Sequence, residues 1–151
     1  MPIKCNKTLE NRQYMQGFTL IEVMVAIVVL SIGLLGLAGL MASSLKNSHS
    51  AYLRTQATWF AYDALDRMRA NRAVALAKGY DLALATAPGG VGLAAADLSE
   101  WDTAIAGTLP EGDGSIEVTE ATRAVTIIIQ WNDTRGTSGG AKEQFRVDTQ
   151  L

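Results

Sequence analysis

An uncharged, largely apolar run of 23 residues, Val23–Leu45, constrains this chain of 151 residues more than any other feature. A helix of about 20 apolar residues crosses the ~30 Å hydrocarbon core of a bilayer. The run is therefore predicted to form one transmembrane helix. Glu22 directly precedes it, and a carboxylate at the edge of a membrane helix is costly enough to suggest a functional role.

The segment before this run, residues 1–17, differs from an ordinary secretory signal. It holds three basic residues against one acid, a net charge of +2. A secretory signal places its cleavage site after the apolar stretch, whereas here the small residue Gly17 comes before it. Cleavage after Gly17 would leave the apolar helix on the mature chain, and the positive leader would stay in the cytoplasm. The alternative is an uncleaved signal anchor in which Gly17 and Glu22 are incidental.

Residues 17–22 read G-F-T-L-I-E at the head of the apolar run. This motif resembles the class III signal peptide of type IV pilins and of the pseudopilins of type II secretion. The resemblance implies that a prepilin peptidase cuts between Gly17 and Phe18, that the new amine of Phe18 is N-methylated, and that Glu22 docks the subunit into a filament. Residues 30–40 (LSIGLLGLAGL) and 66–72 (DRMRANR) also resemble the minor pilins known as type IV pilus modification protein PilV.

Glu22 has two candidate partners if the chain is cleaved after Gly17. The amine of Phe18 lies four residues before Glu22, so the two share one face of a helix. Glu22 then neutralises either its own amine or the amine of a neighbouring subunit, and a pair between subunits would set their axial register. The pilin resemblance favours the second option.

Gly33, Gly36 and Gly39 recur every three residues in the apolar run. Each glycine costs a helix about 1 kcal/mol relative to alanine, but small residues allow membrane helices to pack closely. One interpretation is therefore a helix packing seam, or a flexible segment, in a filament core. The other is that glycine is simply frequent in membrane helices.

The helix that begins near Phe18 meets no strong breaker before Gly79. The spacing predicts one helix to about Ala77, ~90 Å long at 1.5 Å per residue, with an amphipathic second half. Asp63 and Arg67 form an i,i+4 pair in the favourable order. The apolar stripe of the second half comprises Leu53, Ala57, Phe60, Ala64 and Met68, flanked by Tyr52, Trp59 and Tyr62.

Three arginines near the end of this helix, Arg67, Arg69 and Arg72, form a short basic cluster. They are interpreted either as a contact for an acidic neighbour or for membrane phosphates, or as a solvated face where cations suit the helix dipole. The only histidine, His49, has no ligand set nearby and is predicted to be a surface residue.

The rest of the chain predicts a loop, a short helix and three strands. Residues 78–96 are rich in glycine and alanine, which is typical of a loop. Residues 97–107 begin with Asp97 as a candidate N-cap. Alternating apolar residues predict strands within 115–119, 123–132 and 143–150. The apolar faces comprise Leu98, Trp101 and Ile105 in the helix, and Ile116, Val118, Val125, Ile127, Ile129, Trp131, Phe145 and Val147 in the strands.

These elements predict an α+β fold in which a long N-terminal helix packs against a short antiparallel sheet of about three strands. The apolar face of the sheet needs a cover, and the stripe on the helix can supply it. The pilin resemblance implies the same architecture. The expected parts are a cleaved leader (1–17), a transmembrane or filament-core half-helix (18–44) and a periplasmic globular head (45–151). The one cysteine, Cys5, lies in the leader, so the head would contain no disulfide.

The head carries no constellation typical of catalysis. One histidine and one leader cysteine exclude most nucleophile schemes and His/Cys metal sites, and the sequence contains no phosphate-binding glycine loop. We therefore expect no enzyme activity, no cofactor and no metal. Calcium at Glu111–Asp113 or Asp133 is weighed against ordinary turn acids. A ligand surface of Trp59, Trp101 and Trp131 is weighed against three core residues.

Charge and resemblance together predict the partners. The chain carries −2 overall, and the +2 of the leader leaves −4 for residues 18–151, whereas nucleic-acid binders usually present a basic patch. The resemblance implies a minor pilin of the inner membrane and pilus, active in pilus assembly, twitching motility or adhesion. Its implied partners are other minor pilins, the major pilin, the prepilin peptidase and the inner-membrane assembly platform. The alternatives are a minor pseudopilin of type II secretion, or an adhesin or DNA-uptake module with an exposed basic or aromatic patch.

Overall fold

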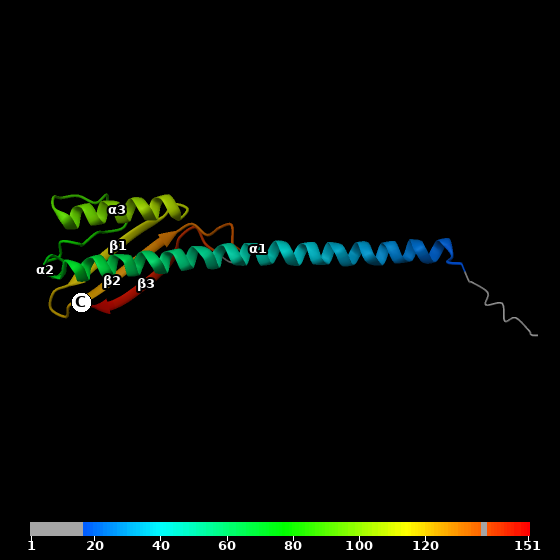
Figure 1. Cartoon of the computed structure of the whole chain (residues 1–151), viewed down its shortest axis with the longest axis horizontal. Coiled ribbons are helices and arrows are strands. Elements are labelled where there is room, and N and C mark those ends of the chain that lie inside the picture. The colour runs from blue at the N-terminus through cyan, green and yellow to red at the C-terminus, as the bar shows by residue number, and fades with distance from the viewer. Residues whose placement is uncertain (1–16, 137–138) are drawn as a thin grey trace, which may run out of the picture. The chain divides into compact units, whose positions relative to one another are not determined.

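The computed structural model describes residues 17–136 and 139–151, so the expected leader lies outside it except for Gly17. Two compact units divide the chain, one up to Leu40 and one, called the head below, from Met41 to Leu151. Figure 1 shows the elements of both units. They are α1 (Leu20–Ala70), α2 (Arg72–Leu76), α3 (Leu93–Thr108), β1 (Asp113–Thr119), β2 (Ala124–Trp131) and β3 (Glu143–Gln150).

Helix α1 ends at Ala70, whereas the sequence predicted one helix that continues to about Ala77. The helical path breaks at Asn71, where φ is −119° and ψ is 47°, and the short helix α2 follows. The side-chain amide of Asn71 donates to the Tyr80 hydroxyl at 3.4 Å. Asparagine side chains compete with helical backbone bonds, and this residue uses its amide outside the helix.

The sheet has the order β1-β2-β3, and both pairs of strands are antiparallel. The register places Ile116 opposite Ile127, and Ile127 opposite Val147. Burial alternates along β2 as the sequence predicted, with Val125, Ile127, Ile129 and Trp131 at most 2% exposed. The predicted α+β fold with a three-stranded antiparallel sheet is therefore confirmed.

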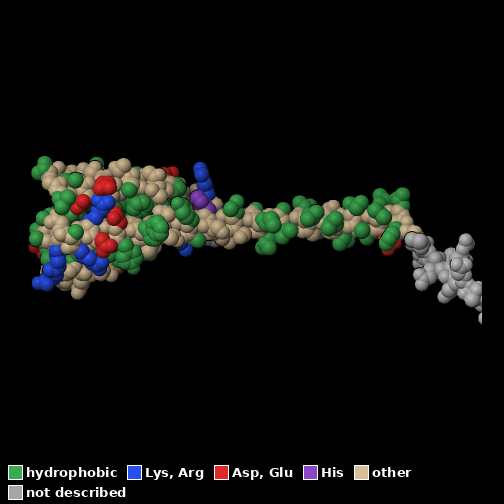
Figure 2. Space-filling model, in the orientation of Figure 1, with side chains coloured by type: hydrophobic (Ala, Val, Ile, Leu, Met, Phe, Trp, Pro, Cys, Tyr) green, Lys and Arg blue, Asp and Glu red, His purple; other side chains and the backbone are tan. Residues whose placement is uncertain are grey.

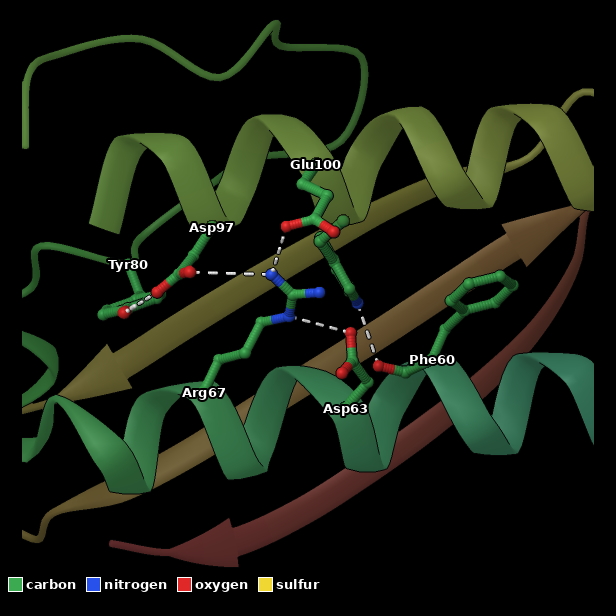
Figure 3. Close-up of polar contacts among 7 residues, drawn as sticks. Phe60, Asp63, Arg67, Tyr80, Asp97 and Glu100 are labelled. Atoms are coloured by element: carbon green, nitrogen blue, oxygen red, sulfur yellow. Dashed lines mark hydrogen bonds and ion pairs between the residues drawn. The ribbon is translucent and has the colours of Figure 1, made fainter. Parts of the chain in front are cut away.

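Helices α1 and α3 both lie over one face of the sheet, as Figure 3 shows. In α3, the predicted apolar face of Leu98, Trp101 and Ile105 is buried. The helix begins at Leu93, however, rather than at Asp97. Gly92 precedes it with a φ of +96°, and the alanines that follow Leu93 are strong helix formers. Asp97 therefore lies inside the helix and is not its cap.

The core of the head contains the predicted stripe of α1. Leu53, Ala57, Ala64 and Met68 are buried, Phe60 is half-buried, and Ala61 and Leu65 widen the stripe. Trp101 and Trp131 are core residues, as one of the two interpretations held. Trp59 is not, because it lies on the other side of α1 and is 65% exposed.

Candidate functional site

The first unit presents the residues of the predicted processing site at the start of α1. Gly17 and Phe18 precede the helix and are exposed, Phe18 by 84%. The backbone N–H of Glu22 donates to the Thr19 carbonyl at 3.1 Å and to its hydroxyl at 3.4 Å. Thr19 therefore acts as the N-cap, and α1 begins at Leu20 rather than at Phe18. Phe18 precedes the helix, so the expected i,i+4 helical relation between Phe18 and Glu22 is not present in this structure.

Glu22 lies in the first turn of α1 and is exposed. A carboxylate suits this place, because the N-terminus of a helix carries partial positive charge. Within the described part of the chain, Glu22 makes no ion pair. Its charge is thus left for a partner outside that part, and its docking role stays a prediction.

The apolar segment that follows is exposed along its whole length. Every residue from Gly17 to Ala42 is exposed, and hydrophobic side chains project along the whole segment in Figure 2. By length and composition, α1 is the one helix in the described residues that could cross a membrane. A continuous apolar surface of this kind requires lipid or other helices around it.

Gly33, Gly36 and Gly39 all lie within α1 and leave its helical path unbroken. No other group of the described chain lies close to the position that a side chain would take at any of them. The three positions are therefore open for a partner helix. The structure neither joins them to Glu22 nor supplies that partner, so the packing seam remains a prediction.

A second exposed apolar surface lies on the part of α1 that belongs to the head. Leu45, Tyr52 and Trp59 repeat every seven residues, and Tyr62 follows three residues after Trp59. We call these four residues the outer seam; each is more than half exposed. Residues seven apart share one helix face, so the outer seam forms an apolar strip outside the core of the head.

The basic cluster predicted near the end of α1 is engaged within the head. Arg67 donates to Asp63 at 2.9 Å, as its i,i+4 spacing predicted, and reaches across to α3. There it contacts Glu100 at 3.0 Å and Asp97 at 3.5 Å. We call these four residues the Arg67 clamp (Figure 3). The hydrogen bond to Glu100 is the largest cause that raises the pKa of Arg67 above its ordinary value; burial opposes it to a smaller extent, and the hydrogen bond to Asp63 adds to the rise.

Tyr80 extends the Arg67 clamp towards the core. Its hydroxyl donates to Asp97 at 2.5 Å, and the residue is 1% exposed. Burial raises the pKa of the Tyr80 phenol above its ordinary value, and the hydrogen bond to Asp97 raises it further. Nearby, the Trp101 indole donates to the Phe60 carbonyl at 2.9 Å. These contacts join α3 to α1 and fix the two helices over the sheet.

The other two arginines of the cluster also have partners within the head. Arg69 pairs with Asp66 at 3.0 Å, and Arg72 donates to the Leu151 carbonyl at 2.7 Å. All three arginines thus have partners within the head, and Arg67, with its side chain only one-quarter exposed, does not belong to the solvated face of one interpretation. His49 is exposed, as predicted.

The acids considered for calcium serve as acceptors within the head. Glu111 accepts from the Asn132 amide at 3.0 Å. Asp113 accepts from two backbone N–H groups, those of Ala85 and Gly114. Asp133 is buried and accepts from the Ser50 hydroxyl. In the described residues, no group of three or more His, Cys, Asp or Glu side chains could hold a metal ion.

Sequence reasoning found the contact of Arg67 with Asp63 but missed those of Arg67 with Asp97 and Glu100, and that of Tyr80 with Asp97. A helical spacing of four residues signals a pair, whereas the other contacts join segments far apart in the chain. It also missed the contact between Ser50 and Asp133 for the same reason.

The comparisons with known proteins bear on the first unit. Residues 12–38 match the family model described as the prokaryotic N-terminal methylation motif. No curated protein and no solved structure matches the chain. The motif and the exposed apolar helix support a membrane-anchored protein that is pilin-like or a pseudopilin, with partners in pilus or secretion machinery.

Proposed function

We propose that this chain is a minor pilin of a type IV pilus, of the PilV type, made as a prepilin in the inner membrane with its head in the periplasm. The observation that carries the proposal is the match to the methylation motif over residues 12–38, in front of and within a fully exposed apolar helix. The positive leader favours a cytoplasmic N-terminus. The chain acts as a structural subunit in pilus assembly and not as an enzyme.

Processing after Gly17 gives Glu22 its role. Cleavage creates a positive amine on Phe18, close to the first turn of α1. Glu22 makes no ion pair in the described residues, so its carboxylate is available to the amine of a neighbouring subunit. In the low dielectric of lipid, an unpaired charge is costly, and this pairing would fix the axial position of each subunit.

The partners follow from the exposed surfaces. The prepilin peptidase acts on Gly17 and Phe18, and Gly33, Gly36 and Gly39 allow a neighbouring helix to approach closely. The outer seam extends the apolar contact surface into the head, where other minor pilins or the major pilin would cover it. The inner-membrane assembly platform receives the subunit before it enters the pilus, and pilus-dependent motility or adhesion would then depend on it. The arginines of α1 are engaged within the head, so nucleic acid is not an expected partner.

Mass spectrometry of the protein extracted from membranes tests the processing step. We expect the mature chain to begin at Phe18 and to carry one added methyl group. Assembly is tested with Glu22→Ala and with Glu22→Gln, which removes the charge but keeps the size of the side chain. Both variants should be processed normally and should enter pili poorly.

Two results would contradict this proposal. A chain that still begins at Met1 would remove the pilin processing, and normal piliation of Glu22→Gln would remove the docking role of the charge. A deletion strain that keeps twitching motility but loses secreted enzymes would assign the chain to type II secretion as a minor pseudopilin.

A further inference from the structure

The two edges of the sheet differ in how their backbone groups are satisfied. On the β1 edge, Ile116 and Leu82 exchange two backbone hydrogen bonds of 2.9 Å each. The N–H of Val118 donates to the Asp81 carboxylate at 2.9 Å, and that of Gly114 donates to Asp113 at 2.8 Å. Side chains and one short bridge thus close this edge.

The β3 edge has no such cover. The N–H of Leu151 donates to the Arg123 carbonyl, directly beyond the ladder that pairs Gln150 with Ala124. The N–H and C=O groups of successive residues point to alternate sides of an antiparallel strand, so this bond shows which residues of β3 point these groups towards β2. The residues whose N–H and C=O groups point away from β2 are Gln144, Arg146, Asp148 and Gln150. Among the described residues, none of these four makes a backbone hydrogen bond outside the sheet.

Strand β3 also lacks the devices that usually protect an edge. It is paired over eight consecutive residues without a bulge, and it contains no proline. Of its three charged residues, Glu143 begins the strand, and Arg146 and Asp148 bind each other at 2.8 Å. The hydrogen bond from Arg146, followed by one from Thr126, lowers the pKa of Asp148 to about 2. The pair is thus self-satisfied and leaves the backbone edge open.

A groove lies between α1 and the start of β3. Its volume is about 440 Å³, and Thr55 and Thr58 of α1 line it together with Trp131 and Phe145. Arg54, Glu143 and Gln144 also line it, and Arg54 approaches Glu143 to 3.9 Å. Side chains alternate between the two faces of a strand. Every second side chain of a strand added beside β3 would therefore face α1, with room for an apolar group next to Phe145.

A second copy of this chain does not fit the open edge. Antiparallel pairing of two β3 strands needs a twofold axis perpendicular to the sheet, which would reverse α1 of the second copy. Because α1 is one helix from Leu20 to Ala70, two copies that share one membrane cannot have α1 reversed. Parallel pairing of two β3 strands about a twofold axis along the strand also fails. Such an axis places each residue beside the same residue of the other copy. Parallel pairing instead places a residue whose backbone groups point outward beside one whose backbone groups point inward. The β1 edge of a second copy is closed.

We propose that the open edge of β3 receives an extended strand from a different subunit of the same assembly, with an apolar side chain in the groove beside Phe145. The strand would pair with the outward backbone groups of residues 144–150, as in other cases of strand addition. This inference rests on the proposed function, because it takes the shared membrane anchor as given.

The experiment uses the full chain in cells that assemble the structure. A photo-crosslinking amino acid at Gln144 probes the open edge, and the same probe at Trp59 reports contacts of the outer seam. Products are identified by mass spectrometry. We expect the probe at Gln144 to give one main product with a different subunit, and peptides of an extended segment within it.

A proline variant with a matched control separates strand pairing from side-chain contact. Arg146→Pro removes an outward N–H and no bond to β2, whereas Arg146→Ala keeps that N–H and removes the charge. The product from Gln144 should fall about tenfold or more in Arg146→Pro, because the acceptor on the added strand loses its donor. It should persist in Arg146→Ala. Thermal unfolding of the purified full-length variants checks that both retain the fold.

Several results would overturn the proposal. Equal yields in folded Arg146→Pro and Arg146→Ala would show that no strand is added, and a product made only of two copies of this chain would show the wrong occupant. If Arg146→Pro fails to fold, the identity of the wild-type product at Gln144 decides instead. Products from Trp59 without products from Gln144 would refute strand addition and leave the minor-pilin proposal intact. Loss of both products, with a chain that begins at Met1, would refute the proposed function itself.

Discussion

Gly114 of β1 lies against the ring of Trp101 in α3, and a single methyl group there should measurably destabilise the head. A Cβ at this position would lie 2.5 Å from Trp101 Cη2, 2.7 Å from its Cζ3 and 3.0 Å from Ile105 Cδ1. Carbon atoms pack favourably at about 3.5–4.0 Å. Trp101 is 1% exposed, and its indole is held by the Phe60 carbonyl, so the ring has little freedom to move away. Gly114→Ala must therefore displace the ring or the strand.

The expected cost follows from overpacking of a well-packed core, which is about 1–3 kcal/mol. For a head of this size, each kcal/mol lowers the melting temperature by roughly 4 °C. Gly114→Ala should therefore melt about 4–12 °C below the wild type. Urea unfolding should give the same loss as a change of midpoint at constant slope.

A double-mutant cycle identifies the ring as the cause. Trp101→Phe removes Cη2 and Cζ3, the two atoms that the new methyl group would meet. In that background, Gly114→Ala should cost less than about 1 kcal/mol, a coupling of the size seen for residues in contact. Gly107→Ala is the matched control, because it lies in exposed helix with open space around it and should stabilise by up to about 1 kcal/mol. An equal cost of Gly114→Ala in both backgrounds would refute the steric explanation.

Two further predictions concern the Arg67 clamp. Arg67→Met should lower the free energy of unfolding by about 1–2 kcal/mol, because three carboxylates then lose their counter-charge. The Arg67 side chain is only one-quarter exposed at this site. Arg69→Met, which removes a solvent-exposed pair, should change it by at most about 0.5 kcal/mol, and equal losses in urea titrations would contradict the difference. The raised pKa of Tyr80 means that its contribution is complete below the ordinary tyrosine value of about 10 and is lost as pH rises through the raised value. Stability should therefore fall less steeply above about pH 10 in Tyr80→Phe than in the wild type, and parallel curves would show that Tyr80 is not the group responsible.

The periodic elements of the head could be predicted because burial repeats along each of them. In β2, Val125, Ile127 and Ile129 alternate with half-buried residues, and a period of two is visible in the sequence alone. The stripe on α1 from Leu53 to Met68 follows the helical period in the same way. Both patterns are local, so neither needs knowledge of the partner that covers it.

The predicted helix boundaries were wrong where a contact with a distant part of the chain, rather than local helix propensity, decided where the helix begins or ends. Asn71 is a weak helix former, but nothing in the sequence shows that its amide bonds to Tyr80, nine residues later, where α1 ends. Helix α3 begins earlier in the chain than predicted, at Leu93 rather than at Asp97. Asp97 has the spacing of a cap, yet its carboxylate accepts from Tyr80 and faces Arg67, so the cap position passed to Gly92.

The processing site and the open edge of β3 show opposite limits of sequence reasoning. Gly17, Phe18 and Glu22 are adjacent in the chain and form a motif, so they could be proposed without a structure. The strands β1 and β3 carry similar alternating patterns, and nothing in either pattern tells which one remains open. The difference arises because Leu82, in a segment that reads as a loop, bridges to Ile116 and closes β1. The open edge is defined by the lack of a backbone pairing with a distant segment, so it can be recognised only when the pairing of the other segments is known. The candidate edge is therefore a result of the topology.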